Sequence, residues 1–475
     1  MTTKPYLVAG RWRTGDEAFE VRSPYDGGVV ARIAVPRDTD VEEAVAAAAS
    51  TFEESRTLPT HVRAEALMHI SRRLEERAEE AAELIAREGG KPLKWSKVET
   101  ARAASTFRWA AEEARRFGGE LLRLDTEASL GSRLGIVRRF PLGPVLGISP
   151  FNFPVNLVAH KLAPALAVGA PIVLKPASAT PLGALFLAEL FTETDLPKGM
   201  VSVLPLSSER AEPLLSDDRF AKVSFTGSGR AGWYLKEKAP KKHFTLELGG
   251  NAGVIVHSDA DLDQAAQRIA FGGYYQAGQS CIAVQRIFVH APAYEDFVTR
   301  LVKQVEALKV GDPLDPQTEV GPLIDRGALE KVQSFVEDAV SKGAEVLVGG
   351  ERNDPFYAPT VLAKVTEDME VCREEIFGPV TTVSPYQTFE EAIDAVNATP
   401  YGLQAGVFTE SIERALQAHR DIVVGGLIVN DVSAFRADQM PYGGSKDSGY
   451  GREGLRYAME EMTEPRILVL SHVPL

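Results

Sequence analysis

Cysteines and long apolar segments are scarce in this sequence. Its 475 residues include only two cysteines, Cys281 and Cys372, too few for a disulfide scaffold or for a cysteine-held zinc or iron–sulfur centre. No apolar run approaches the roughly 20 residues that a membrane-spanning helix needs. Residues 1–6 lack the apolar stretch of a secretory signal. We therefore expect a cytoplasmic protein that binds no metal and no membrane.

Positive charge is also in deficit. Lysine and arginine number 52 against 66 aspartates and glutamates, which gives a net charge of -14. An acidic surface repels a phosphate backbone, so we expect no nucleic-acid partner. The hydrophobic and charged fractions, 44% and 25%, are those of ordinary globular proteins and exclude wholesale disorder. At roughly 150 residues per domain, the length predicts two or three domains.

Hydrophobic spacing separates a helical N-terminal part from an alternating α/β part. Apolar residues recur every three or four positions over 41–52, 61–88 and 96–116, which predicts helices. From Val145 onward, short apolar strands alternate with helical stretches, which is the pattern of a doubly wound parallel sheet. The predicted strands are 145–148, 171–174, 201–204, 222–225 and 244–248, with helices at 155–168, 181–194, 208–215 and 230–237.

A second α/β unit is predicted to begin near Gly250. Its first strands are expected at 252–256 and 287–290, with helices at 262–277 and 293–308. The apolar segment 464–472 has the pattern of a single strand that needs a partner. Either the segment 119–140 pairs with it, or one of the two crosses to another subunit.

Cys281 is the first candidate for chemistry. It lies in Gln276-Ala-Gly-Gln-Ser-Cys, a small glycine-containing turn with polar neighbours that follows a predicted helix. A thiol in such a turn could approach a substrate closely, whereas the alternative is a small buried hydrophobic side chain. Cys372, in Met369-Glu-Val-Cys-Arg, has no glycine-lined approach, and we interpret it as structural.

Two polar residues stand at expected strand ends. Glu247 closes an apolar strand and precedes two glycines. In a desolvated position its pKa would rise and it could act as a general base; the alternative is an edge-strand glutamate that points to water. Asn152 has a proline on each side and precedes a predicted helix. Its amide could donate a hydrogen bond to a developing oxyanion, or it could serve only a turn or a helix cap.

The segment 225–232 has the composition of a phosphate-binding turn. Gly227, Gly229 and Gly232 would let the backbone approach a phosphate, and Ser228 stands at the expected N-terminus of a helix. On its own this pattern is not specific. Lys175 ends another predicted strand and could supply a cation there, or it could simply be solvated.

Taken together, these segments resemble the aldehyde dehydrogenase superfamily. The resemblance rests on motifs that follow one another in the family's order along nearly the whole chain. They are S-P-F-N-F-P with Asn152, L-K-P-A-S with Lys175, F-T-G-S-x-x-x-G with Ser228, L-E-L-G-G with Glu247, G-Q-x-C with Cys281, E-E-I-F-G-P at 374–379 and P-Y-G-G-S-K-x-S-G at 441–449. The separation of Glu247 from Cys281 (281 − 247 = 34) also fits the family.

The resemblance implies a fold and a division of the chain. We expect a cofactor domain with a Rossmann-type doubly wound parallel sheet, an α/β catalytic domain and a β arm for oligomerisation. These would comprise residues 1–118 and 141–249, residues 250–440, and residues 119–140 and 462–475, respectively. The segment 441–461 would lie near the active site, and the protein would be a homodimer or homotetramer.

The resemblance also implies a reaction on a small-molecule aldehyde. The Cys281 thiolate would attack the aldehyde carbon, with the oxyanion held by the Asn152 amide and the Cys281 backbone N–H. After hydride transfer to NAD or NADP, Glu247 would activate the water that hydrolyses the thioester. One alternative is a coenzyme-A-acylating relative, which generally lacks the base glutamate. The other is a non-catalytic protein on the same fold, and the presence of all three residues disfavours both.

Further motif residues are expected around the cofactor. Glu375 would hold the nicotinamide ribose, and Phe377 would pack beside it. Lys175 and Ser228 would hold the adenosine ribose and the pyrophosphate. Three more residues would line the same site, namely Gly227, Gly232 and Leu248.

One position departs from the pattern of NAD-preferring relatives. These commonly carry a glutamate three residues after the lysine, where it accepts both adenosine ribose hydroxyls. Here Ser178 stands at that position, so no charge would repel a 2′-phosphate, and Lys175 could neutralise it. We therefore expect the enzyme to accept NADP as well as NAD, with the preference between them open.

The sequence says less about the identity of the aldehyde substrate than about the reaction. Ser280 precedes the nucleophile where phosphate-reading relatives of the non-phosphorylating glyceraldehyde-3-phosphate type carry arginine, which argues against that substrate. Arg108 lies on a predicted helix that resembles a substrate-tunnel helix of the family. It could bind a carboxylate tail, as in succinate-semialdehyde oxidation, or merely pair with Glu112 at i+4.

Overall fold

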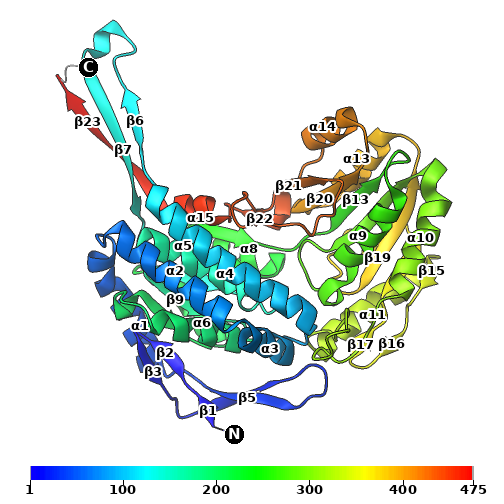
Figure 1. The fold of residues 1–475 in the computed structure, drawn as a ribbon, viewed down its shortest axis with the longest axis horizontal. Coiled ribbons are helices and arrows are strands. Elements are labelled where there is room, and N and C mark those ends of the chain that lie inside the picture. The colour runs from blue at the N-terminus through cyan, green and yellow to red at the C-terminus, as the bar shows by residue number, and fades with distance from the viewer. Residues whose placement is uncertain (1, 473–475) are drawn as a thin grey trace.

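Two large, mostly parallel sheets organise the computed structural model, which describes residues 2–472 (Figure 1). The first sheet has the strand order β22-β12-β11-β8-β9-β10-β2-β3. The strands are β2 (Tyr6–Val8), β3 (Arg11–Arg13), β8 (Val145–Ile148), β9 (Ile172–Lys175), β10 (Val201–Val203), β11 (Lys222–Thr226), β12 (His243–Glu247) and β22 (Gly449–Tyr450). From β12 to β10 neighbouring strands are parallel. The chain order reverses between β8 and β11, and such a switch opens a ligand crevice at the strands' carboxyl ends.

The central strands β9, β11 and β12 are buried along nearly their whole length, as a sheet covered on both faces requires, although β11 and β12 also contain polar residues. The helices that connect them are α5 (Asn156–Val168), α6 (Leu182–Thr192), α7 (Ser208–Ala211) and α8 (Gly229–Lys238). Helix α5 is buried along its whole length, because α4 (Leu93–Arg116), α2 (Thr60–Glu76) and α15 (Leu455–Glu461) pack over it. The predicted strands of this sheet are confirmed.

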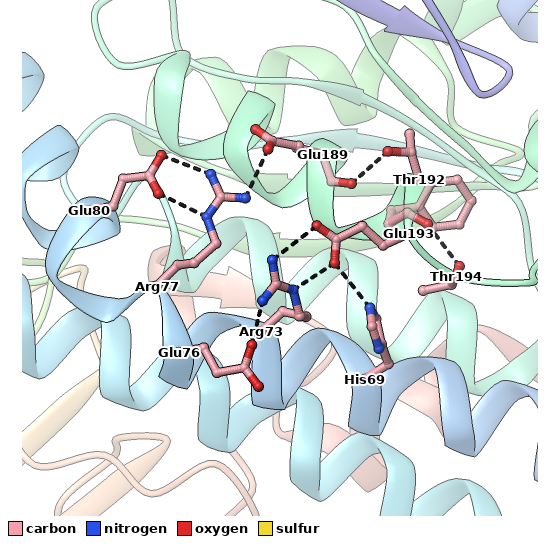
Figure 2. A network of polar contacts seen from close by, with 10 residues as sticks. His69, Arg73, Glu76, Arg77, Glu80, Glu189, Thr192, Glu193 and Thr194 are labelled. Carbon is pink, nitrogen blue, oxygen red and sulfur yellow. Dashed lines mark hydrogen bonds and ion pairs between the residues drawn. The ribbon is translucent and has the colours of Figure 1, made fainter.

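The N-terminal helices differ from the prediction at one place. The helix expected over 61–88 is two helices, α2 and α3 (Ala78–Gly89), which meet at Arg77 with φ −108° and ψ 27°. Figure 2 shows Arg77 bonded to both Glu80 and Glu189. Its guanidinium also lies 4.5 Å from the ring centroid of Phe186 on α6. The break therefore follows from contacts with α6, since neither proline nor glycine marks it. Helix α1 (Asp38–Ser55) precedes the pair.

The second sheet lies beside the first in Figure 1 and has the order β15-β18-β19-β14-β13-β20-β21. Its strands are β13 (Ala252–Val256), β14 (Val284–His290), β15 (Glu345–Val348), β18 (Thr360–Ala363), β19 (Val380–Tyr386), β20 (Gln404–Phe408) and β21 (Gly426–Val429). Its helices are α9 (Leu262–Tyr274), α10 (Tyr294–Glu306), α11 (Arg326–Ser341), α12 (Glu370–Arg373), α13 (Phe389–Asn397) and α14 (Ile412–Asp421). The predicted α/β class, with a doubly wound parallel sheet and a second α/β unit, is confirmed.

Small sheets complete the fold. One joins β1 (Thr3–Lys4), β5 (Val29–Ala34) and β4 (Ala18–Arg22), and another joins β16 (Arg352–Asn353) and β17 (Phe356–Tyr357). A third forms an arm that projects from the body, with the order β23-β7-β6 (Figure 1). Its strands are β6 (Glu120–Arg123), β7 (Arg133–Pro141) and β23 (Thr463–Ser471).

The C-terminal strand thus finds its partner within the chain, as the first of the two predicted alternatives required. Residues Ile467–Leu470 of β23 are apolar and exposed. The predicted domain limits and the expected homodimer or homotetramer stay predictions. No helix among residues 2–472 is both long enough and apolar enough to cross a lipid bilayer.

Candidate active site

The loop that carries Cys281 joins α9 to β14. It begins with a 3-10 turn in which Gln276 and Ala277 take φ values of 53° and 55°. Such values are strained for residues with a Cβ and persist only where the surrounding structure imposes them. Gly278 follows with φ 68°, and a Cβ there would collide with the carbonyl of Gly378. Packing against the entry to β19 therefore fixes the loop that presents the thiol.

The Cys281 thiol is partly buried and contacts one polar group. Its Sγ lies 3.3 Å from the hydroxyl of Tyr442. The pKa of the Cys281 thiol is raised to about 12, mainly by burial; the hydrogen bond with Tyr442 opposes the rise, and the nearby Glu375 and Glu247 carboxylates contribute to it. The thiol is therefore protonated at neutral pH and has to be activated before it can attack.

Asn152 follows β8 and is buried. Its side-chain amide donates a hydrogen bond of 3.0 Å to the carbonyl of Gln279, two residues before Cys281. In return, the side-chain amide of Gln276 donates to the Asn152 carbonyl. These bonds join the first sheet to the nucleophile loop. The N-cap position of α5 is taken by Val155, so the helix-cap alternative for Asn152 is wrong.

Glu247 ends β12 and is only 3% exposed, which excludes the water-facing alternative. Neither carboxylate oxygen accepts a hydrogen bond from residues 2–472. Burial and the neighbouring Glu453 carboxylate raise the pKa of Glu247 well above its ordinary value, although Arg436, Lys161 and Arg452 oppose the rise. A glutamate with a raised pKa can take a proton near neutral pH, as a general base must.

Sequence reasoning missed a cluster of buried charged residues beside these groups. Lys161 of α5 donates a 2.7 Å hydrogen bond to Thr226 and lies 3.5 Å from Glu453. Glu453 also forms a 3.0 Å ion pair with Arg436. The Arg436 guanidinium lies 3.8 Å from the ring centroid of Tyr442, the residue that contacts the thiol. His160 and Lys161 are adjacent polar residues in the otherwise mostly apolar helix α5, and they were the one feature of the sequence that could have indicated this cluster.

Arg102 and His160 flank Asp438 in the same cluster. The Arg102 Nη2 atom lies 3.7 Å and the His160 Nε2 atom 3.5 Å from Asp438 Oδ1. Burial lowers the pKa of Arg102, and the positive charge of Arg436 lowers it further. Arg102 Nη2 and Arg436 Nε are buried and have no hydrogen-bond partner among the described residues. Each guanidinium group therefore has a nitrogen that forms no hydrogen bond among the described residues, although Arg102 also contacts Asp438 and Arg436 pairs with Glu453.

Of the two predicted substrate residues, only Ser280 lies in this region. Ser280 is buried, and its hydroxyl accepts a 2.6 Å hydrogen bond from Tyr275. Arg108 is exposed on the other side of α4, where Nη1 lies 3.7 Å from Glu75 of α2. The structure thus pairs Arg108 with Glu75 rather than Glu112, and this placement does not favour the tail-binding role. The inward-facing arginine of α4 is Arg102.

The residues predicted to bind the adenosine half of the cofactor gather at the carboxyl ends of β9, β11 and β12. Lys175 ends β9 and is buried, which lowers its pKa. Ser178 is exposed three residues later. Ser228 caps α8, and its hydroxyl accepts a 3.4 Å hydrogen bond from Ala231. Gly227 donates its N–H to the carbonyl of Glu247 at 3.0 Å, which connects this turn to the end of β12.

Space around the first turn of α8 fits a phosphate group. A Cβ at Gly229 would meet only one atom, the carbonyl oxygen of Asp447 at 4.0 Å. A Cβ at Gly232 would collide with the side chain of Leu248, so this glycine lets α8 pack closely on the sheet. The open N-terminus of this ten-residue helix can accept a pyrophosphate.

Glu375 and Phe377, the residues predicted to contact the nicotinamide half of the cofactor, lie beside Gly250 and Phe151, respectively. Glu375 accepts a 3.0 Å hydrogen bond from the backbone N–H of Gly250, and burial raises its pKa to about 7. Phe377 has a φ of 56°, and its ring stands edge-on to Phe151 at 5.9 Å. A carboxylate can accept both hydroxyls of a ribose, so these residues fit a dinucleotide. No group of three or more His, Cys, Asp or Glu side chains within residues 2–472 is arranged to hold a metal ion.

Comparison with known proteins gives a consistent result over the full chain. The model of the aldehyde dehydrogenase family matches residues 12–468. The 3-sulfolactaldehyde dehydrogenase of Priestia aryabhattai is 46% identical over 465 residues, which cover 98% of this chain and 97% of that protein.

Two solved structures are also similar. The crystal structure of aldehyde dehydrogenase 21 from Physcomitrella patens in complex with the reaction product succinate has a TM-score of 0.97 and 43% identity, and covers 99% of both chains. The glyceraldehyde-3-phosphate dehydrogenase of Methanocaldococcus jannaschii complexed with NADP has a TM-score of 0.92 and 37% identity, and covers 96% of this chain and 100% of that one.

Proposed function

This chain belongs to the aldehyde dehydrogenase family, and on that premise we propose that it oxidises a short aldehyde with an anionic tail to the corresponding acid. The observation that carries the proposal is a pair of guanidinium groups, that of Arg436, which is buried, and that of Arg102, whose side chain is 28% exposed. Each has a buried N–H without an acceptor among the described residues. Because an unpaired buried donor is unfavourable, a sulfonate or carboxylate is the complement that such a pair favours.

The similar proteins support an anionic substrate. The Priestia relative is named for a sulfonated aldehyde, and the Physcomitrella structure contains succinate. Arg436 lies over Tyr442, which contacts the Cys281 thiol. An anion bound at Arg436 would therefore hold the other end of a short substrate near the nucleophile.

The catalytic residues act in two half-reactions. The Cys281 sulfur forms a bond to the aldehyde carbon, and the Asn152 amide and the Cys281 N–H donate hydrogen bonds to the oxygen as it becomes negative. When bound, NAD(P)+ would supply the hydride acceptor, and oxidation at this carbon would leave a thioester on Cys281. Glu247 then takes a proton from water, whose oxygen attacks the thioester and releases the acid. Ser228 and Lys175 would hold the adenosine half of the cofactor, and Glu375 the nicotinamide ribose.

Replacing Arg102 by alanine tests the tail-binding site. We expect kcat/KM for succinate semialdehyde to fall about tenfold to a hundredfold, because a hydrogen bond to a charged group is lost. Butanal, which has no charged tail, should be oxidised at an unchanged rate. Steady-state kinetics with both aldehydes measure the difference. Arg108→Ala is the matched control, since this arginine lies on the same helix but outside the cluster, and it should affect neither substrate. An equal loss for both aldehydes in the Arg102 variant would contradict the proposal.

The residues at the predicted adenosine end of the cofactor site lead us to expect that the enzyme uses NADP. Ser178 carries no charge that would repel a 2′-phosphate, and Lys175 ends β9 three residues before it. The relative in the NADP complex supports this proposal by analogy only. The measurement is the ratio of kcat/KM for the two cofactors with one aldehyde. We expect kcat/KM with NADP to be at least comparable with that for NAD. A preference for NAD of a hundredfold or more in kcat/KM would contradict this expectation.

A further inference from the structure

We propose that Tyr442 is a further catalytic residue, whose phenol O–H donates a hydrogen bond to the Cys281 sulfur and stabilises it as a thiolate for attack. The inference rests on Cys281 being the nucleophile of the proposed reaction. It does not depend on the charge of the substrate.

The environment of the sulfur gives Tyr442 this role. Tyr442, Ile282 and Leu403 form a small buried apolar cluster, and Cys281 packs against it. The Tyr442 hydroxyl, 3.3 Å from Sγ, makes the one hydrogen bond that the sulfur receives within residues 2–472. A negative charge on sulfur in such surroundings is unfavourable unless a donor compensates it. A hydrogen bond to an ionised acceptor is about twice as strong as one to a neutral acceptor, so this contact favours the thiolate over the thiol.

The backbone of Tyr442 is fixed on the side away from the thiol. Its N–H donates to the Glu453 carbonyl at 3.0 Å, and the Glu453 N–H donates back to the Tyr442 carbonyl at 2.6 Å. Arg436 forms an ion pair with the Glu453 carboxylate and lies over the Tyr442 ring. The aromatic ring is thus held between a cation on one face and the nucleophile loop at its hydroxyl.

The direction of the hydrogen bond between Tyr442 and Cys281 follows from the pKa values of the phenol and the thiol. Burial raises the pKa of the Tyr442 phenol well above its ordinary value. The phenol therefore keeps its proton when Cys281 ionises, and its O–H can only donate to the sulfur. The proton that Cys281 loses on ionisation passes to water, while Tyr442 neither gains nor loses a proton; it orients the sulfur and lowers the free energy of the thiolate.

Alkylation of the resting enzyme tests the proposal directly. In a Cys372→Ala background, Cys281 is the single thiol, and its rate of reaction with iodoacetamide can be followed against pH. In Tyr442→Phe we expect the pKa of the thiol to rise by about one unit or more. Alkylation at neutral to mildly alkaline pH should then slow about threefold to tenfold, because the more basic thiolate of the variant recovers part of the loss. With butanal as substrate, kcat should fall about tenfold with KM little changed.

Two further proteins make the result decisive. Tyr386→Phe is the matched control, because Tyr386 is also buried and its hydroxyl also forms a hydrogen bond, at 2.7 Å to His257, outside the active site. It should react and turn over like the parent. Replacing Tyr442 by 3-fluorotyrosine, a more acidic phenol and a better donor, should shift the alkylation rate in the opposite direction. An unchanged alkylation profile in Tyr442→Phe overturns the proposal. Failure to oxidise any aldehyde would instead count against the proposed function.

Discussion

Cys281→Ser should abolish aldehyde-dependent reduction of NAD(P)+, with kcat lower by about 10⁴-fold or more. Serine preserves the size of the side chain, but its hydroxyl is far less acidic than a thiol. The same apolar surroundings that raise the pKa of the thiol to about 12 would keep a serine hydroxyl un-ionised throughout the accessible pH range. The absorbance of the reduced nicotinamide reports the reaction.

Cys372 provides the control for this experiment. Cys372 lies on α12, away from the Cys281 loop, and Cys372→Ser should retain the parent activity. If the Cys281 variant kept a substantial part of the activity, or if the Cys372 variant lost it, the assignment of the nucleophile would be wrong. Acid formation by the parent enzyme without added coenzyme A would also exclude the acylating alternative.

Glu247→Gln should separate the two half-reactions. Hydride transfer forms the thioester, but without the carboxylate no base activates the water that cleaves it. We therefore expect a burst of reduced cofactor about equal to the enzyme concentration, followed by steady turnover about 10²- to 10⁴-fold slower than in the parent. Rapid-mixing absorbance measurements resolve the two phases.

The pH dependence supplies an independent readout for Glu247. Only the ionised carboxylate acts as a base, and the pKa of Glu247 is raised well above its ordinary value. Parent turnover should therefore rise with pH through a range higher than that of an ordinary glutamate, and Glu247→Gln should lose this rise. A small thiol that takes over the acyl group should restore slow turnover to Glu247→Gln, but not to Cys281→Ser. Parent-like acid release by Glu247→Gln would contradict the role.

The sequence predicts the features that depend on local pattern. The strands 145–148 and 222–226 have helices between them, which predicts a parallel sheet, and both are buried along nearly their whole length. Glu247 could be placed at a strand end for the same reason, because a carboxylate that closes an apolar strand interrupts the pattern. The break at Arg77 could not be found in this way, since it depends on Glu189 and Phe186 of a helix about 110 residues away in the chain.

Local pattern also could not show which arginine of α4, Arg102 or Arg108, faces the active site. Arg102 and Arg108 are six positions apart, which places them about 120° apart around the helix axis. Several helices pack against α4, so the apolar periodicity does not tell which of its polar faces points to the site. Arg436, Asp438 and Glu453 come from a third part of the chain, in loops without regular spacing. Only tertiary structure brings them to Arg102 and His160.

The burial of the Cys281 thiol also bears on how the enzyme survives between turnovers. Peroxides oxidise the thiolate of a cysteine much faster than the thiol, and an oxidised nucleophile is lost to catalysis. A thiol with a pKa of about 12 is almost wholly protonated in the resting enzyme. The apolar surroundings that make activation necessary therefore also slow the oxidation of this sulfur in the resting enzyme.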